Sequence, residues 1–267
     1  MLRVPVLAFL ALLTVAGCAS SSRLRHETPK EAYDRGTAEF NRKRYDRAAE
    51  YYQAVFDYGR ANEWADDAQI GLARAYMASK QYILAASEYS RFSELYRADP
   101  RAAEAEYERA LAYKTLSPGY ELDQTDTERA ISYFQLFINR YPQDARRAAA
   151  QQQITDLRGK MARKLYESAG LYERRELYEA AAMMYDRTFA EYPDADYADD
   201  ALVGATRAYL AYADASVRDR RAERLQKALD AYNRFAQIFP QSPRKAEAED
   251  LYTTIRARLG TGTTAGR

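Results

Sequence analysis

The sequence is poor in the residues on which disulfide-bonded proteins, metal sites and many enzymes depend. Its 267 residues include one cysteine, Cys18, and one histidine, His26. A single cysteine forms no internal disulfide, so the fold must be stabilised by packing, for which this chain length is sufficient. There is no G-x-S-x-G motif and no phosphate-binding glycine loop. We therefore expect no catalytic residues, no enzymatic activity and no cofactor other than a covalent lipid, discussed below.

Neither sign of charge is in excess. The chain has 40 lysines and arginines against 39 aspartates and glutamates. Without a basic surplus, we do not expect a nucleic-acid partner. Glycine and proline are also few, at 11 and 8 residues. The abundance of helix-forming residues predicts a helical protein.

Four carboxylates that lie close together do not predict a metal site. They are Asp194, Asp196, Asp199 and Asp200. Their spacing lacks the central glycine and the closing glutamate of a calcium-binding loop. Acidic residues are also favourable in the first turn of a helix, next to the positive end of its dipole. We expect helix capping here and no bound metal.

One long apolar run is present, and it lies at the N-terminus. Val4 to Ala16 is too short to span a bilayer permanently and follows Arg3, as in a secretory signal peptide. Val15-Ala16-Gly17-Cys18 resembles a bacterial lipobox. This resemblance implies that residues 1–17 are removed and that Cys18 carries a diacylglycerol and an N-acyl chain such as palmitate. The residues after Cys18 include no aspartate that would retain a lipoprotein at the inner membrane. We expect an outer-membrane lipoprotein on the periplasmic face, with residues 18–29 as a flexible tether.

The main signal in the rest of the chain is an internal repeat. An alanine is followed four residues later by an aromatic residue, and farther on by an aromatic-proline pair. The sets are Ala130, Phe134 and Tyr141-Pro142; Ala181, Tyr185 and Tyr192-Pro193; and Ala228, Tyr232 and Phe239-Pro240. Earlier copies begin at Ala48 and Ala85, and residues 65–76 match residues 198–209 almost residue for residue.

The residue types of the repeat indicate pairs of antiparallel helices. Small residues let two helices approach closely, aromatic residues fill the gap to the next pair, and proline ends the second helix. The pattern resembles the tetratricopeptide repeat (TPR). It implies an all-α fold, a right-handed superhelix of about five TPR-type helix pairs with a C-terminal capping helix. The expected helices are 30–42, 46–58, 62–79, 82–97, 101–116, 126–141, 144–174, 176–192, 196–215 and 220–239, then a capping helix at 243–259. Residues 260–267 are expected to be a disordered tail.

A lipobox, a short tether and about five repeats together resemble the BamD family. The similarity extends to residues 141–193, where Leu157, Ala162, Tyr172 and Tyr178 fit the family pattern. It implies a scaffold subunit of the BAM complex, which folds and inserts β-barrel proteins at the outer membrane. The N-terminal repeats (30–142, TPR 1–3) would bind the C-terminal signals of unfolded barrel proteins. The C-terminal repeats and capping helix (143–259, TPR 4–5) would dock on the periplasmic domains of the central barrel protein. The Asp-Asp helix starts and the long final repeat depart from the family.

A candidate peptide groove follows from the repeat geometry, because the first helix of each pair lines the concave face of such a superhelix. The expected groove residues are Tyr33, Thr37, Phe40, Ile70, Arg74, Met77, Tyr107, Leu111 and Lys114. Arg74 and Lys114 would meet a terminal carboxylate between apolar walls. The alternative is that Tyr33, Phe40 and Tyr107 belong to the core between repeats and that Arg74 pairs with a neighbouring acid.

Three other binding functions use related repeats. One is that of a pilus-assembly lipoprotein, similar to a secretin pilotin. Another is that of the trimeric periplasmic partner of the cell-division envelope system, which carries an N-terminal coiled coil; no apolar heptad precedes Tyr33 here. A chaperone adaptor is disfavoured, because Thr37 stands where the carboxylate-binding asparagine of such domains would be.

Overall fold

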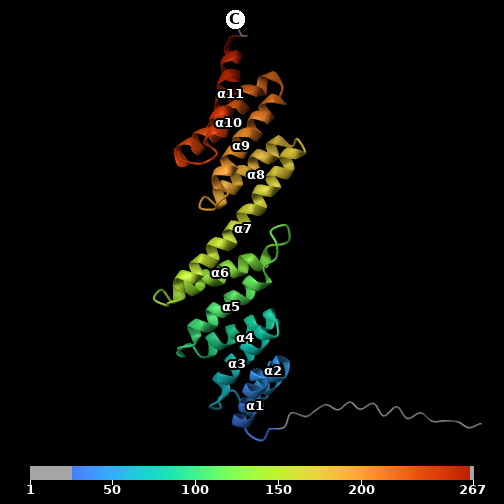
Figure 1. Ribbon diagram of the computed structural model, residues 1–267, viewed down its shortest axis with the longest axis vertical. Helices are drawn as coiled ribbons and strands as arrows, with labels where there is room; N and C mark the ends of the chain where they lie inside the picture. The colour runs from blue at the N-terminus through green and yellow to red at the C-terminus, as the bar shows by residue number, and fades with distance from the viewer. Residues whose placement is uncertain (1–25, 265–267) are drawn as a thin grey trace, which may run out of the picture.

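The computed structural model describes residues 26–264, which form helices stacked one after another along a single long axis (Figure 1). No strand occurs among these residues. The elements are α1 (Pro29–Asn41), α2 (Tyr45–Ala54), the 3-10 helix η1 (Val55–Tyr58), α3 (Ala65–Ala78), α4 (Tyr82–Leu95), α5 (Ala102–Leu116), α6 (Thr125–Arg140), α7 (Arg147–Arg174), α8 (Tyr178–Glu191), α9 (Ala198–Asp214), α10 (Arg218–Ile238) and α11 (Lys245–Thr264). The all-α fold of stacked helix pairs predicted from the sequence is confirmed. Cys18 and the predicted signal peptide lie outside the described residues.

Three helices that open a pair (α3, α5 and α7) and the final helix α11 start three residues after a short polar side chain. These side chains belong to Asn62, Asp99, Asp144 and Ser242, and each accepts a hydrogen bond from the backbone N–H two residues later at 2.7–2.9 Å. Such a turn satisfies a donor that a helix start leaves unpaired. The polar residue therefore fixes where each of these helices begins. Helix α1 starts instead at Pro29, with Thr28 as its N-cap.

The tight turn within three of the pairs contains a residue in the left-handed conformation. Lys43, Lys80 and Glu176 have φ values of 61°, 65° and 60°. The N–H of the next residue reaches back to a carbonyl of the preceding helix at 2.8–3.0 Å. This hydrogen bond closes the end of the first helix, as in a Schellman motif. Glycine would adopt this conformation with less strain than lysine or glutamate.

Tyrosine rings held against small residues form the centres of two helix clusters, one in the N-terminal half of the stack and one in the C-terminal half. The ring of Tyr52 lies between Gly36 and Gly71, and the ring of Tyr185 lies against Gly204. Both rings are buried, and the surrounding clusters consist largely of alanine. The absence of a side chain on these glycines thus lets neighbouring helices approach to the thickness of one aromatic ring.

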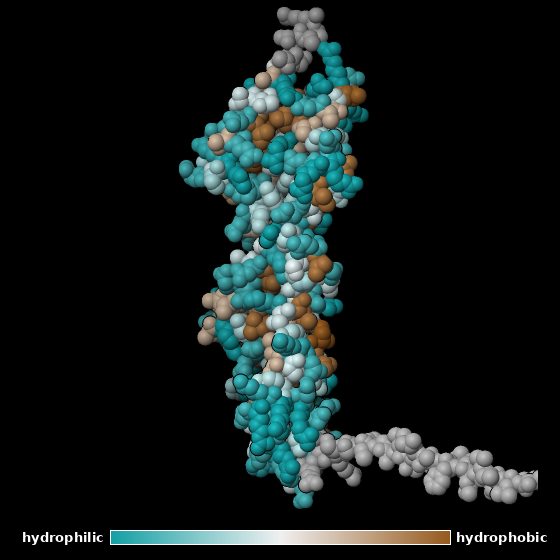
Figure 2. Space-filling model, turned by 45° about the vertical axis from the view of Figure 1, so that its right-hand side comes forward, coloured by the Kyte–Doolittle hydropathy of each residue, from teal (hydrophilic) through white to brown (hydrophobic). Residues whose placement is uncertain are grey.

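Helix α7 joins the two halves of the molecule. Its first half contributes Ala150, Ile154 and Leu157 to the core with α5 and α6. Its second half contributes Ala169, which packs in the core with α8 and α9. The space-filling view shows a narrowing part-way along the length of the molecule (Figure 2). In the same view the surface is mostly hydrophilic, with apolar residues in small separate groups. This face therefore offers mainly polar and charged groups for recognition.

The final helix is longer than the sequence indicated. Helix α11 ends at Thr264, so the prediction that the chain loses its structure from Gly260 is wrong for residues 260–264. Each of the two glycines in this stretch, Gly260 and Gly262, costs only about 1 kcal/mol relative to alanine, and the helix continues through both. Residues 265–267 lie outside the described residues. No helix between residues 26 and 264 has both the length and the apolar character needed to cross a membrane.

Candidate partner-binding surfaces

The structure contains two copies of one three-helix arrangement. In the first, built by α1 to α3, the ring of Tyr33 lies 5.8 Å from that of Tyr52 and 5.3 Å from that of Trp64. In the second, built by the end of α7 with α8 and α9, Tyr166 lies 5.4 Å from Tyr185 and 5.3 Å from Tyr197. Corresponding residues are related by one constant shift in number, from Tyr33 and Tyr166 through Gly71 and Gly204 to the two matched helices. The part of the predicted groove on α1 and α3 can therefore be compared, residue by residue, with the equivalent surface on α7 and α9.

Several predicted groove residues of the first copy also contribute to the core. Tyr33 and Phe40 are half-buried and pack against the cluster around Tyr52. Thr37 lies within hydrogen-bonding distance of the Tyr52 hydroxyl, at 3.2 Å. Their remaining exposed parts are available to a ligand. Whether this face binds peptide stays a prediction.

Ile70 does not lie in an open groove. Its side chain is 2 % exposed and packs with Tyr89 and Phe92 of α4. The prediction for this residue is wrong, because α3 is covered on both sides by neighbouring helices. Only a narrow strip of its surface remains open, and Arg74, four residues later, lies on that strip.

Arg74 has an acidic neighbour on the next pair. Its guanidinium lies 2.5 Å from the Glu104 carboxylate, and its side chain is 45 % exposed. Glu108 lies beside this pair, where burial and the charge of Glu104 raise the pKa of its carboxyl. The expected alternative, in which Arg74 pairs with a neighbouring acid, is therefore what the structure contains. An incoming carboxylate would have to compete with Glu104.

The α5 part of the predicted groove combines packed and exposed groups. Tyr107 lies 5.7 Å from Phe134 and 5.4 Å from Phe137, ring centre to ring centre, and Leu111 packs in the same cluster. Met77 of α3 packs against the neighbouring cluster. Lys114 is half-buried, near the end of α5. The apolar side chains of the predicted groove therefore form its walls. Arg74 and Lys114 lie at separate places along these walls.

The second copy uses its arginine differently. Arg207 donates to the Glu173 carboxylate at 2.7 Å and to Glu247 at the same distance. Tyr185 donates to Glu173 at 2.9 Å. Burial raises the pKa of Glu173, but the hydrogen bonds and charge of Arg207 outweigh this effect and leave it below its ordinary value. Beside these groups is a cavity of about 430 Å³, where Gly170 stands in place of Thr37.

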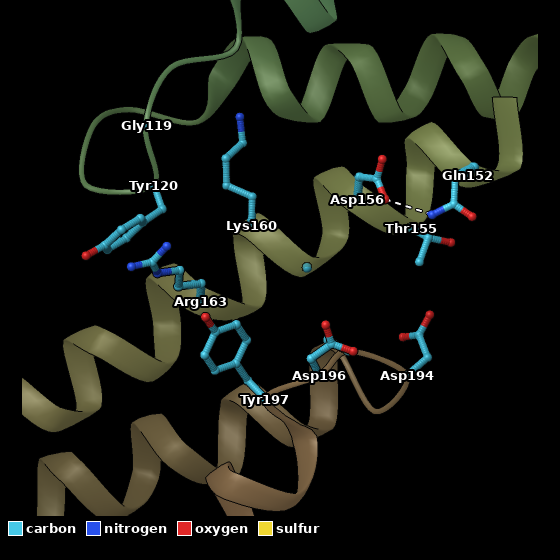
Figure 3. Close-up of a pocket in the computed structure, with 12 residues that line it drawn as sticks. Gly119, Tyr120, Gln152, Thr155, Asp156, Lys160, Arg163, Asp194, Asp196 and Tyr197 are labelled. Atoms are coloured by element: carbon cyan, nitrogen blue, oxygen red, sulfur yellow. Dashed lines mark hydrogen bonds between the residues drawn. The ribbon is translucent and has the colours of Figure 1, made fainter. Parts of the chain in front are cut away.

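A larger groove lies nearer the N-terminal end of α7, and sequence reasoning missed it. It has a volume of about 670 Å³ and is bounded by α7, by the loop after α5 and by the loop before α9. Figure 3 shows Lys160 pointing toward the first loop, Arg163 beside Tyr120, and Asp194 and Asp196 on the opposite side. The signal that could have indicated it is Gly159, an isolated glycine in a long helical pattern.

Acidic residues before and at the start of α9 contact side chains of neighbouring helices. Asp194 accepts from Arg158 at 2.8 Å, and this interaction lowers the pKa of its carboxyl. Asp199 accepts from Ser242 at 2.6 Å, and Asp200 pairs with Arg244. Within residues 26–264 no group of three or more histidine, cysteine, aspartate or glutamate side chains is arranged to hold a metal ion. These acids join successive helix pairs.

The stacked helix pairs and the tyrosine-glycine contacts between them define the class of protein, a TPR-type helical repeat protein. Within this class, residues 25–223 match the model of the YfiO family, described as an outer membrane lipoprotein. This match covers most of the chain, which therefore belongs to the YfiO family. The resemblance to BamD proteins predicted from the sequence is confirmed.

A characterised relative and two solved structures are similar to this chain. The outer membrane protein assembly factor BamD of Caulobacter vibrioides is 25 % identical over 212 residues, which are 78 % of this chain and 70 % of that protein. A TPR repeats protein from Bacteroides fragilis is 15 % identical with a TM-score of 0.48, covering 87 % of this chain and all of the other. A tetratricopeptide repeat protein from Parabacteroides merdae is 14 % identical with a TM-score of 0.37, covering 86 % and 92 %.

Proposed function

We propose that this chain is a lipid-anchored scaffold subunit of the complex that assembles β-barrel proteins in the outer membrane. The observation that carries the proposal is the YfiO family match over residues 25–223, together with a relative that is named as an outer membrane protein assembly factor. A stack of helix pairs with grooves along its length is suited to hold several polypeptides at once. The chain acts by binding and catalyses no reaction. Cys18 attaches it to the periplasmic face of the outer membrane.

The N-terminal repeats are proposed to bind the C-terminal signals of unfolded barrel proteins. Supporting this role are the exposed side of Arg74 and the aromatic and apolar walls formed by Tyr33 and Tyr107. A terminal carboxylate would meet the arginine, and an aromatic side chain of the signal would lie against the walls. The C-terminal repeats are proposed to dock on the periplasmic domains of the central barrel protein.

Co-purification tests the proposal. The chain, tagged at its C-terminus, is extracted from envelopes in mild detergent, and the associated proteins are identified by mass spectrometry. We expect a large barrel protein with repeated periplasmic domains. Recovery of a secretin would favour the pilus-assembly function instead, and recovery of cell-division envelope proteins would favour the function in the cell-division envelope system. Absence of any outer-membrane barrel protein would contradict the proposal.

A further inference from the structure

The N-terminal end of the stack has two edges that differ in charge. Figure 1 shows the turns within helix pairs on one side of the stack and the loops between pairs on the other. The turn edge contains the turn between α1 and α2 and the turn between α3 and α4. Gln81 of the second turn donates to Asp46 at the start of α2 at 2.8 Å, so these two turns are neighbours. The entry edge contains the start of α1 and the loop between α2 and α3, where His26 lies 2.9 Å from the hydroxyl of Tyr58.

Cations outnumber carboxylates on the turn edge. The five cations are Arg42, Lys43, Arg44, Arg47 and Lys80. The three carboxylates are Glu39, Asp46 and Glu50. The Glu39 side chain is only 10 % exposed, whereas Arg42 and Arg44, which pair with it, are 62 % and 63 % exposed. The positive groups of this edge therefore face solvent, and one of the acids that balance them is covered.

On the entry edge the balance is the opposite. Its carboxylates are Glu27, Glu31, Asp57 and Glu63. Its cations are Lys30 and Arg60. A negatively charged surface therefore attracts the turn edge and repels the entry edge.

The turn edge also exposes two aliphatic side chains. Ile83 and Leu84, in the first turn of α4, are both exposed. The other pairs have at least one polar or charged residue at the same two places before the repeat alanine. These places hold Asp46-Arg47, Glu128-Arg129, Glu179-Ala180 and Gln226-Lys227. A surface that combines cations with exposed aliphatic groups suits the headgroup region of an anionic membrane, where both kinds of side chain contribute to binding.

A membrane is within reach of the turn edge in the proposed function, in which Cys18 carries a lipid. The chain from Cys18 to His26 reaches at most about 29 Å, at about 3.6 Å for each residue. Helix α1 rises about 20 Å from Pro29 to Asn41. The lipid of Cys18 can therefore lie in a bilayer whose surface the far end of α1, where the turn edge begins, also touches.

We propose that the turn edge docks on the anionic phospholipid surface of the membrane that holds the lipid of Cys18. The cations of the two turns contact the phosphate groups, and Ile83 and Leu84 enter between the headgroups. This inference rests on the proposed function, because it requires the lipid anchor. The anchor keeps the chain at the membrane, and the turn edge determines which side of the scaffold faces it.

Site-specific fluorescence tests the inference. Cys18 is the only cysteine and its thiol carries the lipid in the full-length lipoprotein, so an introduced cysteine can be labelled alone. A nitrobenzoxadiazole fluorophore is attached to Asn41→Cys, beside the turn edge, or to Asp57→Cys, on the entry edge; both positions are exposed. The lipoproteins are reconstituted into vesicles of equal parts phosphatidylethanolamine and phosphatidylglycerol with a headgroup spin-labelled lipid as quencher. We expect quenching at 41 to be at least about threefold stronger than at 57.

A charge-reversal variant has a matched control. Arg47→Glu with Lys80→Glu reverses two cations of the turn edge that do not pair with Glu39. Arg97→Glu with Arg256→Glu makes the same change in net charge at exposed positions in the loop before α5 and in α11. We expect quenching at 41 to fall at least about threefold with the first double variant and to be unchanged with the second. Circular dichroism identifies the variants that remain folded.

Two further changes separate the contributions of charge and apolar contact. Vesicles of phosphatidylcholine alone remove the anionic lipid and should lower quenching at 41 as the reversal does. Ile83→Ser with Leu84→Ser removes the aliphatic pair and should lower quenching at 41 in the anionic vesicles by a smaller factor.

Other outcomes overturn the inference. Equal quenching at 41 and 57, stronger quenching at 57, or quenching at 41 that the folded reversal variant leaves unchanged would each do so. A disulfide between two copies of unlabelled Asn41→Cys, without quenching of the labelled form by lipid, would show a second copy of this chain on the turn edge and would also overturn it.

Two parallel measurements separate this inference from the proposed function. Mass spectrometry of the purified chain shows whether Cys18 carries the lipid, and co-purification from envelopes shows whether the central barrel protein is bound. If both are found but the two labels are quenched equally, this inference fails alone. If the lipid or the barrel protein is absent, the proposed function fails as well.

Discussion

The two copies of the three-helix arrangement place the same arginine in two different environments. Arg74 in the first copy has Phe40 at the position where Arg207 in the second copy has Glu173. Arg207 is therefore held between Glu173 and Glu247 and is 39 % exposed. Arg74 has one partner, Glu104, on the following pair. The two side chains are similarly exposed, at 39 % for Arg207 and 45 % for Arg74, so the copies differ in the number of carboxylates that pair with the arginine, two in the second copy and one in the first.

The two copies also differ in how far their own side chains fill the concave face. The first has Thr37 next to the Tyr52 hydroxyl, and the second has Gly170 near the Tyr185 hydroxyl. A cavity of about 430 Å³ remains at Gly170. The first copy therefore presents aromatic walls and a cation, and the second presents open space beside an internal ion pair. Similar helices with a few exchanged residues offer different binding surfaces.

The largest expected effect tests a feature that both copies share, the packing of a glycine against a buried tyrosine ring. Gly71→Ala and Gly204→Ala should each lower the free energy of unfolding by about 1–3 kcal/mol, because the new methyl group overlaps a buried tyrosine ring. Urea unfolding followed by circular dichroism measures this change. Gly159→Ala is the control and should raise the free energy of unfolding by up to about 1 kcal/mol. Equal effects at all three positions would contradict the packing described here.

The next effect separates the two arginines. Arg207→Ala should cost about 1–2 kcal/mol of stability, because it leaves the carboxylate of Glu173 half-buried without its cation. Arg74→Ala should cost less than about 1 kcal/mol, as for an exposed ion pair. The same urea experiment measures both.

Arg74→Ala should weaken peptide binding more than Arg207→Ala does, which is the reverse of their order by loss of stability. Fluorescence anisotropy with a labelled peptide that ends in phenylalanine should show weaker binding to Arg74→Ala, and unchanged binding to a folded Arg207→Ala. The same peptide with an amidated C-terminus should bind weakly to every form. Equal binding by Arg74→Ala and the unchanged protein would remove Arg74 from the proposed site.

A smaller, stabilising effect is expected at the tight turns within the helix pairs. Both copies have a residue in the left-handed conformation there. Lys43→Gly, Lys80→Gly and Glu176→Gly should each raise the free energy of unfolding by about 0.5–1 kcal/mol, because glycine adopts a positive φ without strain. The gain is partly offset by the greater freedom of glycine in the unfolded chain. A shift in the urea midpoint measures it. Lys43→Ala, which keeps the strain, should give no gain.

The smallest effect is a difference in acid sensitivity. The folded pKa of Glu173 lies below its ordinary value of 4.5, because Arg207 outweighs the effect of burial. A carboxyl with a lowered folded pKa stabilises the fold above its unfolded pKa, and this contribution is lost as the pH falls through the folded pKa. Below about pH 4.5, stability should therefore fall more steeply for the unchanged protein than for Arg207→Ala. Urea midpoints at several pH values provide the comparison, and parallel curves would contradict it.

The sequence predicted the order of the helices because alanine, aromatic residues and proline recur at fixed places in each pair. Local polar residues such as Asp99 and Asp144 place helix starts through contacts two residues away, so starts can be inferred from short stretches. The prediction that the last helix ends before Gly260 was wrong, because glycine lowers helix stability without by itself ending a helix, and α11 continues through both Gly260 and Gly262.

The binding surfaces were harder to predict, because they depend on helices that are distant in sequence. Ile70 and Arg74 share a helix face by spacing, yet contacts with α4 bury the first and leave the second exposed. The carboxylate that pairs with Arg74 is 30 positions away, and the groove at Gly159 has walls from two separate loops. The spacing of residues within one helix does not reveal contacts with helices and loops that are distant in sequence.

Depletion of this chain in its own bacterium tests the central claim most directly. The measured quantity is the fraction of a resident outer-membrane β-barrel protein that is folded, read from its heat-dependent mobility in a gel. A scaffold of barrel assembly predicts that this fraction falls as the chain is depleted and recovers when the chain is restored. Folded barrels at their normal level, with loss of secretin multimers or of cell-division function alone, would contradict the account.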